Sequence, residues 1–472
     1  MNTLKKTLSL VAALGMMLSF TACGGDSSTT TPGGSTESKT EESKAEESKA
    51  EDSKDTEGKE PINVYAFTDE VPKMVTKYLD THPDDAAKYY MNDTQIPTTD
   101  GLYQPALDQA LADKGVDMFA AEAAFVLKYT QGEGSKYAIP YEELGIDLSK
   151  VQSAEIAQYT VDIGTNPDGK LVGLGYQATG GAFIYRRSIA KDVFGTDDPA
   201  TIQKEVGPGW DQFYKAAEKL KGKGYGIVSG DGDIWHAIEN SSSQGWVVSD
   251  KLVIDPKREE FLDLSKKLKD NNYHNDTEDW SDNWKADMAG KGEKGIFGFF
   301  GPAWLINYTM SENVGGTKAG EGTYGDWAVC EPPVGFFWGG TWILGTKDCK
   351  QKDVVGRIIE WITLDTSDTG LQYMWANGTF DPKKPTKDCV ASGVVMKKSD
   401  GKVDILGGQN MFDVFIPANT YANGKNLTPY DEDINRLWRD QVRQYTAGNK
   451  TRDAAIADFK QAVSDKLDID AQ

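Results

Sequence analysis

Apolar and polar positions follow two different periods where the ordered part of the chain begins. The segment 62–67, INVYAF, has the composition and alternation of a short β-strand. The next segment, TDEVPKMVTKYLDTHP, places apolar residues at helical spacing from Val71 to Leu79. Thr68 is a candidate N-cap for this helix, and Pro83 is expected to end it. The pattern predicts a strand followed by a helix.

The same strand and helix patterns recur through the middle of the chain. GLYQPALDQALADKG predicts a helix that ends at Gly115, and VDMFAAEAAF predicts a strand that leads into another helix. GGAFIYRRSIAKDVFG predicts a strand and a helix. WDQFYKAAEKLKGKGYGIVSG predicts a helix that stops at Gly222 and Gly224, followed by a further strand. Alternation of this kind favours an α/β protein with largely parallel sheets.

Two apolar stretches with glycines follow, and helices dominate the end of the chain. EKGIFGFFGPAWLINYTM predicts a strand that meets a helix at Gly301 and Pro302. DWAVCEPPVGFFWGGTWILG predicts a strand, a loop and a second strand. Three amphipathic segments predict the last helices: KDVVGRIIEWITLD, DEDINRLWRDQVRQYTAG and TRDAAIADFKQAVSDKL. No internal repeat of fixed period is present.

The first residues have the pattern of an export signal. Lysines at 5–6 precede an apolar core at 8–20, which is too short to span a bilayer comfortably. Cys23 follows small residues, so the segment resembles a bacterial lipoprotein signal, although Phe20 stands where Leu is usual. A diacylated cysteine would supply two-chain membrane anchoring. Ordinary cleavage near Ala22, which would give a free secreted product, is the alternative.

The segment after this cysteine is expected to be a tether. Residues 24–60 contain no aromatic residue and no Leu, Ile or Val, and ESKTEESKAEESKAEDSK repeats a lysine every five residues among acids. Such a segment buries too little apolar surface to offset the entropy of ordering. We therefore expect a signal peptide at 1–22, then the lipidated Cys23 and a disordered acidic tether at 23–60. The lipid is the only expected membrane contact.

Length and charge narrow the class of protein. A chain of 472 residues is long enough for two or three domains. The net charge of -22, without a basic stripe, argues against binding to nucleic acid or to anionic lipid head groups. Length and charge together favour a soluble protein with an acidic surface, whose partner is neither nucleic acid nor an anionic membrane surface.

The remaining cysteines and the histidines do not predict a metal site. Cys330, Cys349 and Cys389 are widely spaced and odd in number, so they form neither a disulfide framework nor a metal-binding motif. Buried, unpaired thiols are the expectation, and one disulfide remains open. The histidines, His82, His236 and His274, are scattered along the chain. No metal and no cofactor are expected.

The order of four segments resembles that of the extracellular solute-binding proteins of carbohydrate ABC importers, the family-1 class that includes maltose-binding protein. These segments are INVYAFTDEVPKMVTKYL, GGAFIYRRSIAKDVFG with GPGWDQFYKAAEKLK, GFFGPAW, and the final KTRDAAIADFKQAV. Each is weak by itself, but their order and the lipoprotein signal are specific. The resemblance covers residues 61–467.

This resemblance implies a class II periplasmic-binding-protein-like fold, an α/β fold of two lobes with a ligand cleft between them. Each lobe would be a mainly parallel sheet flanked by helices. Lobe one would hold residues 61–178 and 324–379, and lobe two residues 179–323 and 380–472. The position of the cleft agrees with the general tendency of ligands to bind at strand ends and domain boundaries.

The implied function is high-affinity capture of an extracellular sugar or oligosaccharide, without chemistry, by hinge closure. The loaded protein would deliver the sugar to the transmembrane subunits of an ABC permease. A monomer without cofactor is expected, anchored on the outer face of the cytoplasmic membrane of a Gram-positive cell. The chain itself has no G-x-x-x-x-G-K-[ST] phosphate-binding loop.

The stretch GFFWGGTWILG is a candidate ligand-binding loop, since the resemblance places it beside the cleft. A sugar packs its C–H faces on aromatic rings, so Trp338 is expected to stack on the ligand. Gly339 and Gly340 would let the backbone approach the hydroxyl groups. The alternative is that these aromatics belong to the core, and this alternative is favoured for Phe337 and Trp342.

Other candidates lie at predicted strand ends and turns. Trp304 in GPAW is a second stacking candidate, although Ala303 separates it from the glycine-proline pair. The polar candidates, with one further aromatic residue, are Asp69, Glu70, Tyr103, Glu122, Asp231, Asp233 and Trp235; His236, Tyr176 and Gln177 are weaker. A helix-capping role stays open for the first two acids. A calcium loop or a plain glycine turn stays open for SGDGDIWHAIENSS.

Three other functions remain open at this point. An anchored glycoside hydrolase would also line a cleft with tryptophans and use two carboxylates, such as Asp69 with Glu70 or Asp231 with Asp233. The same scaffold could bind a peptide, an amino acid or another polar solute. A surface adhesin is the third. The richness in Trp and the absence of a clear arginine cluster favour a sugar, and the protein is expected not to be an enzyme.

Overall fold

The computed structural model describes residues 56–98 and 101–471, and Lys54–Gln472 form one compact unit. The predicted signal peptide, Cys23 and the predicted tether lie outside the described residues, except for 56–60. Regular structure begins with β1 (Glu60–Ala66), one residue before the predicted start. Among the described residues, no helix is both long and apolar enough to cross a membrane.

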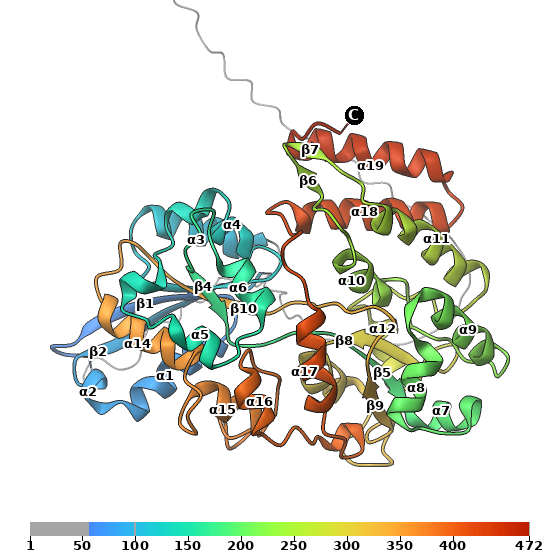
Figure 1. The fold of residues 1–472 in the computed structure, drawn as a ribbon, viewed down its shortest axis with the longest axis horizontal. Helices are drawn as coiled ribbons and strands as arrows, with labels where there is room; N and C mark the ends of the chain where they lie inside the picture. The colour runs from blue at the N-terminus through green and yellow to red at the C-terminus, as the bar shows by residue number, and fades with distance from the viewer. Residues whose placement is uncertain (1–55, 99–100, 472) are drawn as a thin grey trace, which may run out of the picture. The chain divides into compact units, whose positions relative to one another are not determined.

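The first sheet has five strands in the order β2 (Tyr89–Gln95), β1, β3 (Met118–Glu122), β10 (Thr341–Gly345) and β4 (Gly173–Gly175). β1 pairs in parallel with β2 and β3, as expected for strands joined by helices. β10 arrives from far along the chain and pairs antiparallel with β3 and β4. Figure 1 shows this sheet with helices around it. Most of its strands therefore run in one direction, as predicted.

Both faces of this sheet are buried because β3 points alternate residues to opposite sides. Met118 and Ala120 join the core under α1 (Glu70–Thr81) and α14 (Lys352–Thr363). Phe119 joins the other core, with residues of α3 (Tyr103–Ala112). The end of β3 is consequently fixed from both sides, and Glu122 is its last residue.

The second sheet has three strands, with β5 (Ala182–Arg186) between β8 (Gly298–Gly301) and β9 (Trp327–Cys330). Both pairings are antiparallel, so the mainly parallel sheet expected in each lobe is found only in the first. Antiparallel pairing needs no crossover helix between neighbours. The strand predicted after Gly224 forms only a parallel bridge between Gly226 and Ile296.

Helices cover the second sheet and pack on one another through large aromatic side chains. Phe183 of β5, Phe213 of α9 and Trp438 of α18 belong to one buried core. These helices are α7 (Arg187–Phe194), α8 (Pro199–Val206), α9 (Gly209–Lys221), α10 (Gly232–Asn240), α11 (Pro256–Asp270), α12 (Asp282–Met288), α18 (Asp431–Thr446) and α19 (Arg452–Leu467).

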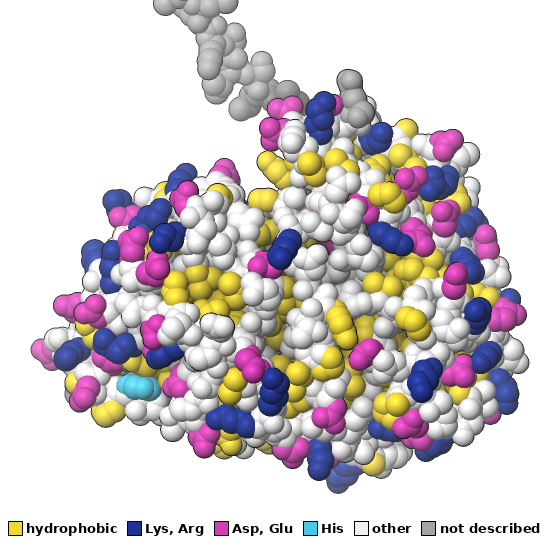
Figure 2. Space-filling view, in the orientation of Figure 1, with side chains coloured by type: hydrophobic (Ala, Val, Ile, Leu, Met, Phe, Trp, Pro, Cys, Tyr) yellow, Lys and Arg dark blue, Asp and Glu magenta, His cyan; other side chains and the backbone are white. Residues whose placement is uncertain are grey.

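Shorter elements complete the described chain. The remaining elements are α2 (Pro83–Ala86), α4 (Val126–Thr130), η2 (Glu133–Lys136), η3 (Tyr141–Leu144), α5 (Ser149–Ser153), α6 (Gln158–Gly164), β6 (Val247–Val248), β7 (Lys251–Leu252), η4 (Leu305–Met310, a π-helix), α13 (Ser311–Asn313), α15 (Leu371–Ala376), α16 (Gly393–Lys397), η5 (Asp404–Leu406) and α17 (Phe412–Tyr421). On the face in Figure 2, acidic and basic side chains of the described residues are mixed, without a continuous basic patch.

The lobe boundaries stay a prediction, and two observations bear on where to draw them. β9 pairs in the second sheet, although residues 324–379 were assigned to lobe one. The backbone N–H of Ala157 donates to the carbonyl of Ala391, 2.9 Å away, so part of 380–472 packs beside α6. We propose that the chain crosses between lobes after Cys330 and again beyond α16.

The three described cysteines are buried and unpaired, so the burial predicted for them is confirmed. Cys330 and Cys389 are 1% exposed and Cys349 is 5% exposed. They fill the cores as small apolar groups.

Candidate functional site

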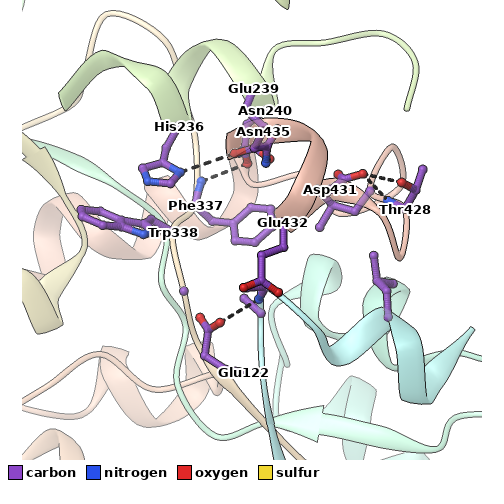
Figure 3. Close-up of a pocket in the computed structure, with 15 residues that line it drawn as sticks. Glu122, His236, Glu239, Asn240, Phe337, Trp338, Thr428, Asp431, Glu432 and Asn435 are labelled. Atoms are coloured by element: carbon purple, nitrogen blue, oxygen red, sulfur yellow. Dashed lines mark hydrogen bonds and ion pairs between the residues drawn. The ribbon is translucent and has the colours of Figure 1, made fainter. Parts of the chain in front are cut away.

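A cavity of about 200 Å³ lies where the end of β3 meets the loop before β10 and the helices α10 and α18 (Figure 3). Elements of both sheet regions therefore contribute to one wall. The side chains that carry polar groups there are Glu122, His236, Glu239, Asn240, Thr428, Asp431, Glu432 and Asn435. The apolar part of the wall includes Leu127, Phe337, Trp338 and Leu427.

The loop before β10 is shaped by two glycines. Gly339 has φ +73° and Gly340 has φ +112°, conformations that residues with a side chain rarely adopt. The loop is held by three hydrogen bonds that involve Thr179 and Ala123: Trp338 N donates to the Thr179 carbonyl, Thr179 Oγ1 to the Gly339 carbonyl, and Ala123 N to the Gly340 carbonyl. The predicted need for glycine is thus a requirement of backbone geometry.

Three tryptophans from separate segments meet beside this loop. Trp304 Nε1 donates to the carbonyl of Trp338 at 3.0 Å, and their rings lie edge to face at 4.8 Å. Trp280 lies parallel to Trp304, with centroids 6.0 Å apart, and edge-on to Trp338 at 5.8 Å. Trp280 is 50% exposed. The cluster therefore presents aromatic surface that the fold itself does not cover.

Sequence reasoning missed Trp280. It stands in the polar run TEDWSDN, and its one apolar neighbour at helix spacing is Trp284, four residues later. The φ of +68° at Trp280 is uncommon for a residue with a side chain. A large apolar side chain in a polar segment was the one available sign of an exposed binding role.

His236 and Glu239 form a polar group on α10. The His236 ring stacks on Trp338 with centroids 4.4 Å apart, and its Nδ1 lies 3.4 Å from Glu239 Oε2. Asn435 Nδ2 donates to Glu239 Oε1 at 2.5 Å. Burial raises the pKa of Glu239, but the hydrogen bond to His236 and the charges of His236 and Arg258 outweigh it and lower that pKa. Glu239 is therefore a fixed negative charge in the wall.

Glu122 reaches the cavity from the end of β3. Its Oε2 accepts the backbone N–H of Ala124 at 2.8 Å. Figure 3 shows its carboxylate and that of Glu432 approaching the same part of the cavity from β3 and α18. Loss of water raises the pKa of Glu122 to about 7, and the charge of Glu432 adds to this rise. Glu122, one of the polar candidates from the sequence, therefore lines this cavity.

Glu70 belongs to a different polar cluster. It accepts a hydrogen bond from the hydroxyl of Tyr176, and burial raises its pKa. Nearby, Asp388 accepts hydrogen bonds from Gln177 Nε2 at 3.2 Å and from Asn307 Nδ2 at 3.4 Å. Burial, with the charge of Glu70 adding to it, raises the pKa of Asp388 to about 7. Sequence reasoning found Glu70, Tyr176 and Gln177 but missed Asp388 and Asn307, which come from distant segments.

Asp69 and Asp231 lie at helix starts. Asp69 is exposed at the N-cap position of α1 and forms an ion pair with Lys73 at 2.5 Å. Asp231 occupies the N-cap position of α10. The plain-turn alternative for SGDGDIWHAIENSS applies only as far as Asp231, because helix α10 begins at Gly232.

Three predicted site residues lie in the interior. Tyr103 is 1% exposed and donates to the carbonyl of Ala120 at 2.7 Å. Trp235 is 1% exposed and packs on Phe261. Asp233 is 5% exposed and accepts hydrogen bonds from the backbone of Ser229 and Gly230 and from Trp284 Nε1. Because their side chains are occupied within the fold, we leave them out of the proposed site.

Two alternatives left open by the sequence are decided for the described residues. Phe337 is 5% exposed and Trp342 is 1% exposed, which confirms that they are core residues, although Phe337 also borders the cavity. Within 56–98 and 101–471, no group of three or more His, Cys, Asp or Glu side chains is placed to hold a metal ion. The calcium-loop alternative therefore has no support there.

Comparisons with solved structures show a shared fold. A protein described as an extracellular solute-binding protein family 1 aligns with a TM-score of 0.69 and 17% identity, over 86% of this chain and 99% of its own. The galacto-N-biose/lacto-N-biose I-binding protein of an ABC transporter from Bifidobacterium longum, in complex with lacto-N-biose, aligns with a TM-score of 0.63 and 15% identity, over 88% and 99%. An ABC substrate-binding protein from Listeria monocytogenes, in complex with cycloalternan, aligns with a TM-score of 0.60 and 15% identity, over 87% of this chain and 100% of its own.

The sequence itself gives the family. No curated protein matches it. The family model described as bacterial extracellular solute-binding protein matches residues 73–398, which is more than half of the chain and includes the second sheet and every strand of the first except β1. With the two-lobed α/β fold of the solved structures, this match decides the assignment. The chain therefore belongs to the bacterial extracellular solute-binding proteins, a family of extracytoplasmic binding proteins.

Proposed function

We propose that this protein captures an extracellular sugar or oligosaccharide with high affinity and delivers it to an ABC importer. The observation that carries the proposal is the meeting of Trp280, Trp304 and Trp338 beside a wall of carboxyl and amide groups. Sugar rings have apolar C–H faces that pack on aromatic rings, and hydroxyl groups that need hydrogen-bond partners. Two solved structures of similar fold contain lacto-N-biose and cycloalternan, which supports this class of ligand.

Each side chain has a role in this proposal. Trp304, Trp338 and Trp280 supply stacking surface, and the backbone at Gly339 and Gly340 approaches the hydroxyl groups. Carboxylates accept strong hydrogen bonds from hydroxyl groups, which is the role of Glu122 and Glu239, while Asn435 supplies an amide. Glu70 and Asp388, with the residues that hydrogen-bond to them, form a second polar region for a longer sugar. Asp69 and Asp231, at helix starts, stay further candidates for ligand contact.

Capture by closure follows from where these groups originate. Glu122 belongs to the first sheet, whereas His236, Glu239 and Asn435 belong to helices that pack around the second. A sugar that contacts both groups stabilises the arrangement in which they are close. A shift from mostly open to mostly closed requires about 5.5 kcal/mol of differential affinity. Delivery to the transmembrane subunits of the permease, without chemical change to the sugar, completes the role of this monomer.

We also propose that the protein is held on the outer face of the cytoplasmic membrane of a Gram-positive cell by a lipid on Cys23. The support is the apolar core at 8–20 with small residues before this cysteine. Metabolic labelling with an alkyne analogue of palmitate tests it. Label is expected on the full chain and should be lost in Cys23→Ala; equal labelling of both proteins would contradict the proposal.

The function is tested by a thermal-shift screen of Lys54–Gln472, the compact unit, against mono- and oligosaccharides, amino acids and peptides. A sugar that raises the melting temperature and is recovered intact supports capture for transport. Cleavage of the sugar would make the protein a glycoside hydrolase. A shift with peptides or amino acids alone would show that the aromatic cluster serves another solute.

A further inference from the structure

The cavity has an unbalanced charge. Four carboxyl side chains, Glu122, Glu239, Asp431 and Glu432, line its described wall. His236 is the one basic side chain in that wall, which contains no lysine or arginine among the described residues. A wall of this composition disfavours an anionic ligand, because each carboxylate adds repulsion in a partly desolvated space.

Glu239 is already compensated by its neighbours. His236 and Asn435 contact it directly, and the buried Arg258 lowers its pKa from behind. Arg258 is fully buried, with its guanidinium 4.3 Å above the ring of Trp246. This charge is therefore balanced within the protein and needs no ligand.

Glu122 and Glu432 are less well compensated. A hydrogen bond from Gln104 and the charges of Arg436 and Lys466 lower the pKa of Glu432, but burial and Asp433 outweigh them and raise it. Neither Glu122 nor Glu432 forms an ion pair with any residue in the described part of the chain. They approach the cavity from different parts of the molecule, Glu122 from the end of β3 and Glu432 from the first turn of α18 (Figure 3). Each carboxylate raises the electrostatic cost of the other, as the effect of Glu432 on the pKa of Glu122 indicates.

Asp431 supplies an independent observation. It is only 7% exposed and forms part of the cavity wall. Its Oδ1 accepts the backbone N–H of Thr428 at 3.1 Å and the hydroxyl of the same residue. Its Oδ2 is buried and has no hydrogen-bond partner among the described residues. A buried carboxylate oxygen without a donor costs free energy. The charge of Arg258 lowers the pKa of Asp431, but burial and the charge of Glu239 outweigh it.

From these contacts we infer that the sugar captured here carries a protonated amino group, which binds between Glu122 and Glu432 beside Asp431. An ammonium group has three N–H donors and one positive charge, which match two carboxylates without an ion pair among the described residues and an oxygen without a hydrogen-bond partner there. Amino sugars would then be preferred over neutral sugars, and uronic acids would be rejected. The inference rests on the proposed function, because it specifies the sugar that the same cavity takes.

The inference also gives a direction for pH. Burial raises the pKa of both Glu122 and Asp431 to about 7, so lowering the pH protonates the groups that would hold the ammonium. Binding of an amino sugar should therefore weaken as the pH falls below about 7. The other titratable groups around these carboxyls are His236, Glu239, Arg258, Glu432, Asp433, Arg436 and Lys466.

Calorimetry of Lys54–Gln472 tests the inference with matched sugars. The probes are glucose, galactose and mannose with their 2-amino and 2-acetamido forms, the β-1,4-linked glucosamine dimer with its N-acetylated form, glucuronic acid, and spermidine. At least one amino sugar is expected to bind tenfold or more tightly than both its hydroxyl and its N-acetyl counterpart, a difference of about 1.4 kcal/mol. Glucuronic acid should not bind.

Two variants and a control locate the effect. Glu122→Gln and Glu432→Gln should each reduce the preference for the amine over the neutral sugar at least fivefold. Glu122→Gln should also weaken binding of the neutral sugar, because Glu122 accepts hydrogen bonds from its hydroxyl groups. Glu143→Gln, at an exposed position outside the cavity, should change neither. Glu432 is itself exposed, so its variant tests the inference even if the Glu122 variant folds poorly.

The outcomes separate this inference from the function on which it rests. Neutral sugars that bind as tightly as the amines would overturn the inference and leave sugar capture standing. Absence of binding by every sugar would overturn both. Binding of spermidine without any sugar would show an ammonium site for a polyamine, and would also overturn the inference.

Discussion

The tryptophans show how the surroundings of a side chain decide whether it is buried or exposed. Trp304 and Trp338 stand close to glycines in the sequence, which predicted an approachable surface, and both lie in the cluster. Trp235 also stands close to glycines in the sequence, in GDGDIW, yet its side chain is buried, because it lies on the inner face of helix α10. The exposure of a tryptophan thus depends on the element that carries it.

Replacing Trp280 by alanine should weaken sugar binding about tenfold, because the ligand loses a half-exposed aromatic ring on which it stacks. The free energy of unfolding should change by less than about 1 kcal/mol, as for exposed substitutions. Trp235→Ala is the matched comparison: it removes a buried ring and should cost roughly 3–5 kcal/mol of stability. Calorimetry and denaturant unfolding measure the two effects. Unchanged affinity in Trp280→Ala would remove this residue from the site.

Substitution of Gly339 by alanine should lower both stability and affinity. A Cβ there would lie 3.4 Å from Trp304 Nε1, and the backbone has φ +73°. Gly448→Ala is the control, since Gly448 has φ +79° with nothing within 4 Å of an added Cβ. Both should lose about 1 kcal/mol of unfolding free energy from the backbone alone. Only Gly339→Ala should also weaken the sugar complex at least threefold; equal affinities in the two variants would contradict the assigned role of this loop.

At the scale of elements, periodicity predicted the long helices and most strands but not their partners. β1, α1, α9 and the three last long helices, α14, α18 and α19, follow apolar spacing closely. β2 was missed, because YYMNDTQ is polar and lies at an edge where one side needs no apolar residues. α10 was missed, because SGDGD has turn composition and the helix starts within it.

The cavity could be predicted only in part, for a related physical reason. Glu122 was recognised because an acidic side chain amid small residues at a strand end is unusual unless it points into a polar pocket. Asp431, Glu432 and Asn435 were not recognised, since on α18 they have the ordinary appearance of a solvated helix start. Their approach to β3 is a tertiary fact that no local pattern contains.

Glu122, at the end of β3, should make the stability of the unliganded protein depend on pH. The pKa of Glu122 is raised from 4.5 to about 7, so the folded state holds its proton more tightly than the unfolded state does. Its contribution to stability is therefore present at low pH and is lost as the pH rises from about 4.5 through 7. Glu122→Gln should raise the melting temperature, relative to the native protein, more at about pH 8 than at about pH 5.

Melting curves of both proteins at the two pH values check this expectation. Glu143→Gln, which alters an exposed carboxyl away from the cavity, serves as the control and should show no such dependence. An equal effect of Glu122→Gln at both pH values would mean that the carboxyl keeps its ordinary pKa.

At the scale of the whole molecule, the two sheets differ in construction and the cavity joins them. The first sheet is a mostly parallel βα arrangement, and the second is a short antiparallel sheet covered by helices. Glu122 from the first region and the α10 and α18 side chains from the second meet in one wall. Binding by closure is the mechanism that this division of the wall supports.

The most direct test of the account is a calorimetric titration of Lys54–Gln472 with the sugar that gives the largest thermal shift, followed by chromatography of the recovered sugar. The account predicts saturable binding of one sugar per chain, loss of affinity in Trp338→Ala, and recovery of the sugar unchanged. A sugar that binds equally well to Trp338→Ala, or that is recovered cleaved, would contradict capture in this cavity.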